Sequence, residues 1–291
     1  MHPRYWGLWL GLGMLRLICL LPYRHLVTIG TYIGQIALHL APRRARIARI
    51  NIAHCLPELT EATRETILRT HFTALGIGLV VNWVRSPETM RPLIQIDGLE
   101  HLQQALAKKK GVILLSAHCT DLEAGTRLLT LFLDTPLHVV YQVNENPFLE
   151  RAIVDNRNRH AASSIKQNEI RDMLKALKAG DIVWYAPDQA YGGKSTAVVP
   201  FFGLPCLSNT ATSRIAHLSG SPVVPFFIRR LPKAQGYVLT LYPALDNFPS
   251  GDPAADTLRF HRLIEIETRK APEQYFWVHR RFKDTRPEMY Q

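Results

Sequence analysis

Short apolar runs alternate with amphipathic stretches along the chain from residue 93 onward. Runs of β-branched and aliphatic residues predict strands, and stretches with helical spacing separate several of them. The predicted strands are Ile94–Ile96, Val112–Leu115, Leu137–Tyr141, Ile182–Ala186 and Val223–Ile228, with Tyr237–Tyr242 as an edge strand. Repeated strand–helix alternation is typical of a parallel sheet covered by helices. We therefore expect an α/β fold with a mainly parallel central sheet flanked by helices.

Capping residues mark where several helices begin. Asn146 followed by Pro147 predicts one helix start, and Asn168 predicts another. Two longer helices are expected over Thr60–Arg85 and Ala254–Lys270, where apolar residues recur at helical spacing.

The most apolar stretch of the chain is Trp6–Tyr23. At about 1.5 Å per residue it is borderline for spanning a bilayer, and Arg16 in its middle argues against an undisturbed span. Its aromatic residues suit the membrane interface. A secretory signal and a buried core helix are the alternatives, although no A-x-A-like cleavage site follows. We expect residues 1–24 to form a membrane-inserted or interfacial anchor helix, and 25–291 a single α/β domain with a helical first part over 25–90.

A basic segment follows the second apolar stretch. Pro42–Arg49 holds four arginines within seven residues. Such a segment is attracted to anionic headgroups by about 1 kcal/mol per basic residue; a solvated helix face is the alternative. Under the positive-inside rule the chain after the anchor is cytoplasmic.

The overall charge indicates which classes of binding partner to expect. The formal net charge is +11, which implies an acidic partner: nucleic acid, anionic lipid or an acidic protein. Basic and aromatic residues do not interleave as in RNA-binding motifs, which disfavours nucleic acid. The four cysteines are widely spaced without a C-x-x-C pair, so neither a zinc site nor a disulfide framework is expected and a reducing compartment is the default.

Gly111–Glu123, with the sequence G-V-I-L-L-S-A-H-C-T-D-L-E, holds the main candidate chemistry. A buried strand ends and His118 follows, at the sheet edge where α/β proteins bind ligands. His118 is a candidate general base, and Glu123 is a candidate carboxylate to orient it. A capping or core histidine is the alternative, and Asp121 is a rival carboxylate. The spacing is not H-E-x-x-H, so a metal site is not indicated.

Further polar residues are expected near this edge. Asp188 follows the strand Ile182–Ala186, and a turn or cap is its alternative role. Arg157 and Arg159 suit a phosphate or an oxyanion, although cations also favour a helix C-terminus for electrostatic reasons alone. The run Gly192–Ser195 lacks the first glycine of a phosphate loop, and no G-x-S-x-G elbow is present.

Taken together these residues resemble the glycerolipid acyltransferase superfamily and, more closely, the late acyltransferases of lipid A biosynthesis. His118 and Glu123 match the H-x4-E hallmark of that family, whose members often have aromatic residues and glycine between the pair. The other matching stretches are H-P-R-Y-W-G at 2–7, L-A-P-R-R at 40–44, V-W-Y-A-P-D-Q at 183–189, V-P-F-F-G at 199–203 and P-E-Q-Y-F-W-V-H-R-R-F-K at 272–283. The likeness covers nearly the whole chain.

The resemblance implies transfer of an acyl chain from an acyl carrier protein thioester to a hydroxyacyl hydroxyl of a Kdo-bearing lipid A precursor. It also implies a bacterial inner-membrane location with the catalytic domain at the cytoplasmic face, and no cofactor. His118 would act as the base, Arg159 is the first candidate to hold the oxyanion, and Phe201, Phe202 and Gly203 are candidates to line the acyl pocket, with ordinary core as their alternative. Another lipid acceptor and a non-catalytic protein that binds anionic lipid are the remaining alternatives.

Overall fold

A computed structural model of the chain describes residues 6–84, 86–190 and 192–291. The H-P-R-Y part of the first motif, at residues 2–5, lies outside the described residues. The helices are α1 (Trp6–Ile18), α2 (Tyr23–Leu40), α3 (Pro42–Cys55), α4 (Glu61–Val81), α5 (Leu99–Leu106), α6 (Leu122–Thr130), α7 (Pro147–Arg157), α8 (Ile170–Lys178), α9 (Ala211–Ser219) and α10 (Pro253–Lys270). Short 3-10 helices are η2 (Pro87–Leu93), η3 (Pro232–Ala234), η4 (Pro272–Gln274) and η5 (Pro287–Tyr290).

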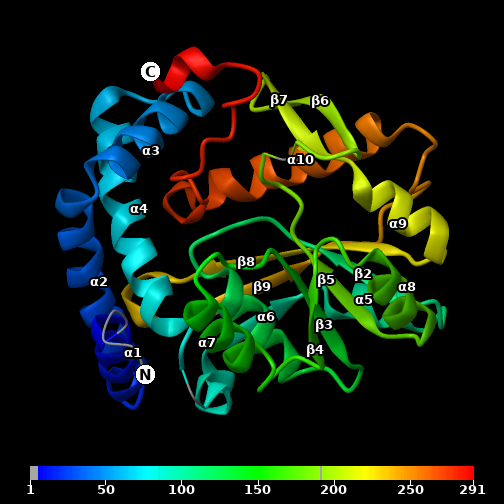
Figure 1. Cartoon of the computed structure of the whole chain (residues 1–291), viewed down its shortest axis with the longest axis horizontal. Helices are drawn as coiled ribbons and strands as arrows, with labels where there is room; N and C mark the ends of the chain where they lie inside the picture. Colours follow the sequence, from blue (N-terminus) through cyan, green and yellow to red (C-terminus); the bar gives the residue numbers. More distant parts are fainter. Residues whose placement is uncertain (1–5, 85, 191) are drawn as a thin grey trace.

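A seven-stranded sheet forms the centre of the molecule, in the order β1-β9-β8-β2-β5-β3-β4 (Figure 1). Its strands are β1 (Ile94–Asp97), β2 (Val112–Leu115), β3 (Leu137–Tyr141), β4 (Ser163–Lys166), β5 (Ile182–Tyr185), β8 (Val223–Arg230) and β9 (Tyr237–Leu241), and a separate hairpin joins β6 (Thr196–Phe201) to β7 (Leu204–Asn209). The pairings from β8 through β4 are parallel, and β9 is antiparallel to β8. The expectation of a mainly parallel sheet flanked by helices is confirmed.

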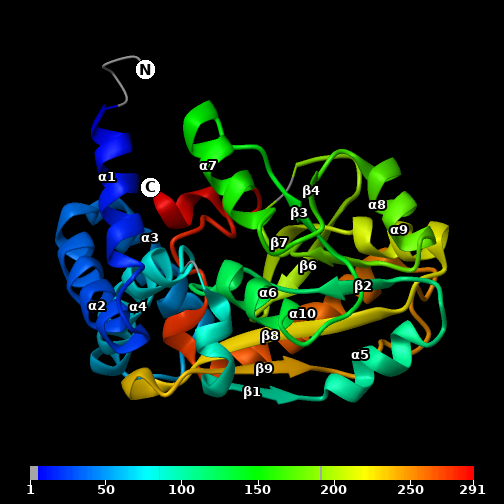
Figure 2. The same cartoon turned by 90° about the horizontal axis from the view of Figure 1, so that it is seen from below.

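Both faces of the sheet are buried, because side chains alternate between two cores along each strand. In β2, Ile113 and Leu115 belong to one core and Val112 and Leu114 to the other. The first core includes residues of α10 and the second includes residues of α5 and α6. Figures 1 and 2 show α10 on one side of the sheet and α5 and α6 on the other.

Three local predictions need correction. The predicted edge strand at 237 is β9, which lies between β1 and β8; a strand's place in a sheet depends on partners far away in sequence. Asn168 does not cap α8, which begins after Glu169 without a side-chain cap. The first apolar stretch is not one helix: α1 ends at Ile18 and α2 begins after Pro22, since proline is tolerated at a helix start but not inside.

The helix starts at Asn146 and Thr60 are confirmed. The Asn146 side chain accepts hydrogen bonds from the backbone N–H groups of Phe148 and Leu149, and Thr60 accepts one from Thr63 N. Within the described ranges, no helix combines the length and the apolar character needed to cross a bilayer. The anchor over residues 1–24 therefore stays a prediction.

Candidate active site

His118 lies where strand β2 leaves the sheet. All of β2 is buried, and its ladder to β5 extends one residue further through a hydrogen bond of 2.8 Å from Ser116 N to Tyr185 O. The chain then turns away, and the His118 side chain is 28% exposed. His118 thus stands at the carboxyl end of a central parallel strand, the edge at which ligands bind in such sheets.

Asp188 is the carboxylate that holds His118. Its Oδ1 lies 2.5 Å from His118 Nδ1 and accepts a second hydrogen bond, of 3.0 Å, from the His118 backbone N–H. Burial raises the pKa of Asp188, but the charge of His118 and its hydrogen bonds outweigh burial, so the net pKa is lowered. An ionised Asp188 fixes the proton of His118 on Nδ1. The other ring nitrogen, Nε2, is then an acceptor, and no described residue hydrogen-bonds to it.

Glu123 pairs with Arg157 instead of His118. Glu123 lies in the first turn of α6, and Arg157 lies at the end of α7. Arg157 Nε lies 2.8 and 3.1 Å from the two carboxylate oxygens, and its Nη2 also bonds Oε1. Burial lowers the pKa of Arg157, but the hydrogen bond and the charge of Glu123 raise this pKa by more than burial lowers it. The net shift of the pKa is therefore upward. The structure therefore gives Asp188 the contact that the H-x4-E spacing predicts for Glu123.

Asp121 belongs to a buried network and does not contact His118. Its side chain is 1% exposed and accepts hydrogen bonds from Arg230 Nη1 (2.8 Å), Thr120 Oγ1 (2.8 Å) and the Tyr237 hydroxyl (3.1 Å). These contacts tie the turn after β2 to β8 and β9. The carboxylate of Asp121 is thus fully used in this buried network.

The C-terminal segment forms one wall of the site, a role that the sequence did not reveal. Thr120 N donates to Gln274 O at 2.9 Å, and Phe276 N donates to His118 O at 3.3 Å. Further along, His279 Nε2 accepts a hydrogen bond of 3.0 Å from Ala190 N. Burial lowers the pKa of His279 to about 4, so the ring is neutral and able to accept. The signal in the sequence was the family motif P-E-Q-Y-F-W-V-H-R-R-F-K at 272–283, which gave no placement beside His118.

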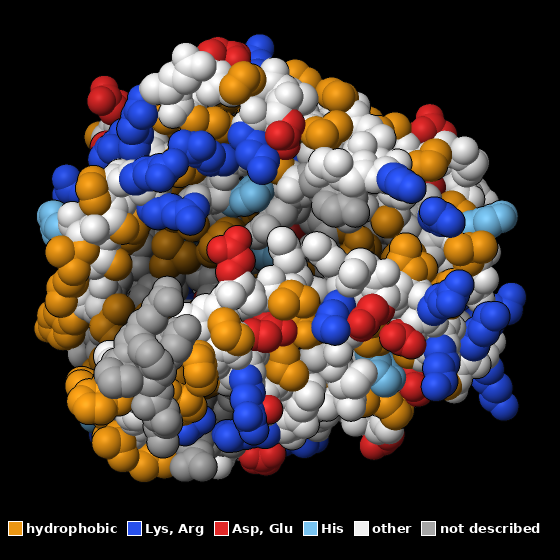
Figure 3. Space-filling model, in the orientation of Figure 1, with side chains coloured by type: hydrophobic (Ala, Val, Ile, Leu, Met, Phe, Trp, Pro, Cys, Tyr) orange, Lys and Arg blue, Asp and Glu red, His pale blue; other side chains and the backbone are white. Residues whose placement is uncertain are grey.

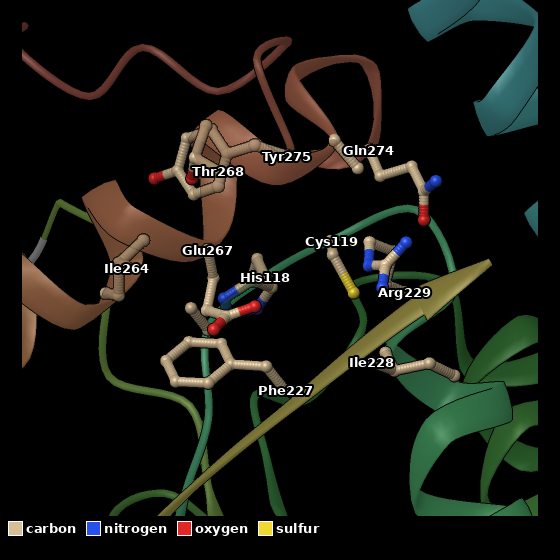
Figure 4. A pocket seen from close by; sticks show the side chains of 12 residues that line it. His118, Cys119, Phe227, Ile228, Arg229, Ile264, Glu267, Thr268, Gln274 and Tyr275 are labelled. Carbon is tan, nitrogen blue, oxygen red and sulfur yellow. The ribbon is translucent and has the colours of Figure 1, made fainter. Parts of the chain in front are cut away.

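Two cavities of opposite character meet at His118. The first, here called the polar cleft, has a volume of about 310 Å³, and its lining includes His118, Glu123, Arg157, Gln142, Gln167 and Gln189. The second, here called the apolar pocket, has a volume of about 40 Å³. Its lining is mainly apolar and includes Cys119, Phe227, Ile228, Ile264 and Tyr275, together with His118, Arg229 and Glu267. Figure 4 shows the apolar pocket with its residues from β8, α10 and the loop after β2 around His118.

Four of the residues predicted for the site lie elsewhere. Arg159 is exposed beyond the end of α7 and belongs to neither lining. Phe201 is 1% exposed and packs its ring 5.6 Å from Tyr275. Phe202 and Gly203 form the tight turn between β6 and β7, with φ of +50° and +74°. None of these four lines either cavity; the apolar wall beside His118 comes from β8 and α10 instead.

Comparisons with known proteins identify the family of the chain. Residues 1–284 match the family described as bacterial lipid A biosynthesis acyltransferase. The chain is 36% identical to the lipid A biosynthesis lauroyltransferase of Escherichia coli K12, over 99% of this chain and 94% of the relative. It is 35% identical to the palmitoleoyltransferase of the same strain, again over 99% and 94%, and 27% identical to the myristoyltransferase, over 98% and 90%.

The names of these relatives differ in the acyl group and agree in the reaction class. The match spans the whole sheet, the turn that holds His118 and the C-terminal wall of the site. The chain therefore belongs to the bacterial lipid A biosynthesis acyltransferase family and is an acyltransferase.

Proposed function

We propose that this acyltransferase moves a fatty acyl chain from an acyl carrier protein thioester to a hydroxyacyl hydroxyl of a Kdo-bearing lipid A precursor, with His118 as the general base. The observation that carries the proposal is the placement of His118. Its Nδ1 is held by a buried carboxylate, and its ring stands between a polar and an apolar cavity. Because His118 lines both cavities, one cavity can hold a polar acceptor and the other an apolar acyl chain while both reach the base.

The reaction proceeds by direct transfer. His118 Nε2 takes the proton of the acceptor hydroxyl as the oxygen attacks the thioester carbon, and Asp188 stabilises the imidazolium that forms. The carbon–sulfur bond then breaks, and the leaving thiolate takes the proton from the imidazolium. General base catalysis of this kind contributes about 10²–10⁴-fold. Asp188 thereby takes the positioning role expected of Glu123.

The test is acyl transfer by the purified full chain, given acyl carrier protein thioester and lipid IVA in detergent micelles. Mass spectrometry should show one added acyl chain. His118→Ala should abolish the product while the protein still binds the lipid. Equal product from His118→Ala would rule out the base assignment, and no product with any lipid acceptor would rule out the proposed reaction.

A membrane-docking face lies beside the site. On α1 the exposed side chains of Trp6, Leu10, Met14 and Leu17 are spaced by three or four residues, with exposed fractions of 55 to 68%. Such spacing puts them on one side of the helix. An exposed apolar stripe of this kind inserts into the boundary between headgroups and acyl chains. We therefore propose α1 as an interfacial anchor. The cytoplasmic face of the inner membrane, which the resemblance to lipid A acyltransferases implies, is the proposed location.

Basic side chains form a second candidate membrane contact, at α3 and the C-terminal segment and away from α1 (Figure 1). Arg44 Nη1 donates to Val278 O at 3.1 Å, which joins α3 to the C-terminal segment. The exposed or partly exposed cations brought together there are Arg43, Arg44, Arg46, Arg280, Lys283 and Arg286. In Figure 3 basic side chains gather at the upper left, along the upper rim of a hollow in the surface. Each cation near an anionic membrane surface contributes about 1 kcal/mol.

Sedimentation with vesicles that contain anionic lipid tests the docking face. The double variant Leu10→Glu/Leu17→Glu should lose binding, because both side chains are exposed on α1. Leu218→Glu is the matched control, since Leu218 is 49% exposed on the distant helix α9. Equal loss from the control and the double variant would contradict the assignment.

A further inference from the structure

Arg281 carries a buried positive charge that no described carboxylate pairs with. The residue is 3% exposed. Its Nη1 donates to Leu207 O at 3.1 Å, and its Nη2 donates to Ser208 Oγ at 2.9 Å and to His261 Nε2 at 3.1 Å. Its Cζ lies 5.4 Å from the centroid of the Phe201 ring. A charge taken out of water without an opposite charge is costly, so we looked for a compensating charge in the same region.

The histidine among these partners is neutral. His261 Nδ1 lies 2.8 Å from Pro200 O, so Nδ1 carries the ring proton and Nε2 accepts from Arg281. Burial, together with the charge of Arg281, lowers the pKa of His261 to about 4. Arg281 therefore gains a hydrogen bond from α10 but no opposite charge.

Another buried arginine of the molecule has the pairing that Arg281 lacks. Arg230 is 8% exposed, and its Nη1 donates to Asp121 Oδ1 at 2.8 Å. The two charges cancel at close range, as is usual for ionised groups inside a protein. The charge of Arg281 must be balanced over a longer distance.

Asp188 is the complementary case, a buried negative charge to which no described lysine or arginine bonds. Its side chain is 2% exposed, and it contacts His118. A histidine that acts as a base is neutral before the reaction, so this contact leaves the charge of Asp188 unbalanced. Burial raises the pKa of Asp188, and the charges of His118 and Arg281, with hydrogen bonds from His118, lower it by more. While His118 is neutral, the charge of Arg281 remains to keep Asp188 ionised.

Backbone contacts join these two charges into one unit. Ser208, to which Arg281 donates, pairs with Ala190 in an antiparallel bridge. Ala190 lies two residues after Asp188, and its N–H donates to His279 Nε2 at 3.0 Å. The loop after β5 is thus held by β7 and by the C-terminal segment, and the guanidinium of Arg281 bonds those two elements to each other.

The other ionisable side chains around His118 and Asp188 are paired, partly exposed or neutral. Asp256, which lines a small cavity with Asp188, accepts hydrogen bonds from Ser213 Oγ at 2.9 Å and from Ser250 N at 3.1 Å. Burial raises the pKa of Cys119 and Tyr275 and lowers that of His279 to about 4. The remaining charged groups at the two cavities are Glu123 with Arg157, Glu267 with Lys270, and the partly exposed Arg229.

We infer that Arg281 is a positioning residue for acyl transfer. Its charge keeps Asp188 ionised while His118 is neutral, and its hydrogen bonds hold the loop that carries Asp188. The inference rests on the proposed function, because it takes His118 as the base. It gives a role to a residue of the motif at 272–283, to which the sequence assigned none.

The pH dependence of kcat/KM for the full chain, with acyl carrier protein thioester and lipid IVA, tests this role. Protonation of the His118–Asp188 pair removes the negative charge that Arg281 balances. Loss of the Arg281 charge therefore favours the protonated, inactive pair, and Arg281→Gln should move the acidic limb of the profile to higher pH by about one pH unit. Arg281→Lys keeps the charge and should retain the native limb.

Arg269→Gln is the matched control for the loss of one positive charge. Arg269 lies near the end of α10 with a side chain 52% exposed, paired with Glu58, so the acidic limb should not move. A lower activity of Arg281→Gln at every pH, without a shift of the limb, would make Arg281 a merely structural residue and overturn the inference.

Denaturant unfolding of Asp188→Asn, Arg281→Gln and the double variant tests the pairing without turnover. Each single variant leaves one buried charge alone, whereas the double variant leaves neither. The unfolding equilibrium constant of the double variant should therefore lie at least about threefold below the value expected from adding the two single effects. Additive effects would refute the pairing. Coupling supports it even if the chain transfers no acyl group to this lipid.

The same comparison decides the case in which Arg281→Gln does not fold. Neutralising Asp188 as well removes the charge that was left alone, so the double variant should recover the native circular dichroism spectrum. A double variant that also fails to fold would show that Arg281 serves the fold through its hydrogen bonds alone, against the inference.

Discussion

Asp188→Asn isolates the contribution of one buried charge. In the native site Asp188 Oδ1 accepts hydrogen bonds from Nδ1 and from the backbone N of His118, and its side chain is 2% exposed. Asparagine keeps the shape and one acceptor oxygen, so the loop after β2 should keep its conformation. What disappears is the negative charge that stabilises the imidazolium in the transition state.

The size of the effect follows from Coulomb's law. Two unit charges about 4 Å apart in a medium with an effective dielectric constant of about 20 attract by about 4 kcal/mol. A barrier higher by that amount slows the reaction by about 10³-fold. The corresponding substitution in the Ser-His-Asp triad lowers kcat by about 10⁴. We therefore expect kcat to fall by about 10²–10⁴-fold, with little change in the KM of either substrate.

The assay is acyl transfer at saturating donor and acceptor, followed by mass spectrometry of the lipid product. Circular dichroism should show native secondary structure in Asp188→Asn, so that lost activity does not reflect unfolding. Asp188→Ala, which removes both the charge and the acceptor, should be at least as slow. A kcat within threefold of the native value in Asp188→Asn would refute the view that Asp188 positions and stabilises His118.

Three further predictions concern the Glu123–Arg157 pair, the apolar pocket and the buried His71. Glu123→Gln and Arg157→Gln should each lower kcat/KM, and the double variant should lose no more than the worse single one, because the two side chains act as a bonded pair; additive losses would contradict this. Ile264→Phe should shorten the transferred acyl chain by narrowing the apolar pocket, as seen by mass spectrometry with mixed donors, whereas Ile266→Phe, at a position 51% exposed on the same helix, should not. Burial lowers the pKa of His71 to about 4, so from about pH 6.5 downward only the unfolded chain gains this proton. The free energy of unfolding should fall by up to about 1.4 kcal/mol per pH unit from this group, and denaturant unfolding at pH 7, 6 and 5 should show a shallower fall in His71→Gln.

The strands and several helix starts were predictable because their causes are local. The unbroken apolar run Val112–Leu115 predicts a strand buried on both faces, and β2 has those bounds. Asn146 and Pro147 predict the start of α7 within a few residues. The position of His118 at the end of β2 follows from the same local pattern. The prediction of one helix over Trp6–Tyr23 was wrong because it ignored Pro22, after which a new helix begins.

The contacts of the site were decided by tertiary structure alone. Glu123 is five residues from His118 along the chain, yet Asp188, seventy residues away, holds the ring. The reason is the strand order, which puts β5 beside β2 and so brings the loop after β5 against the loop after β2. Glu123 lies in the first turn of α6, and its partner Arg157 comes from the end of α7, a helix far away in sequence.

The two cavities were likewise beyond the reach of the sequence. Phe201 and Phe202 are apolar, as expected of residues that line an acyl pocket. The ring of Phe201 instead packs in the core against Tyr275, and Phe202 lies in the tight turn between β6 and β7. The apolar wall comes instead from β8 and α10, and the C-terminal segment completes it. The sequence by itself determined most strands of the central sheet and the position of His118 at a strand end, because hydrophobic periodicity and capping act over a few residues. Only the tertiary structure decided which carboxylate contacts His118 and which residues surround it, because those contacts depend on how distant strands are ordered in the sheet.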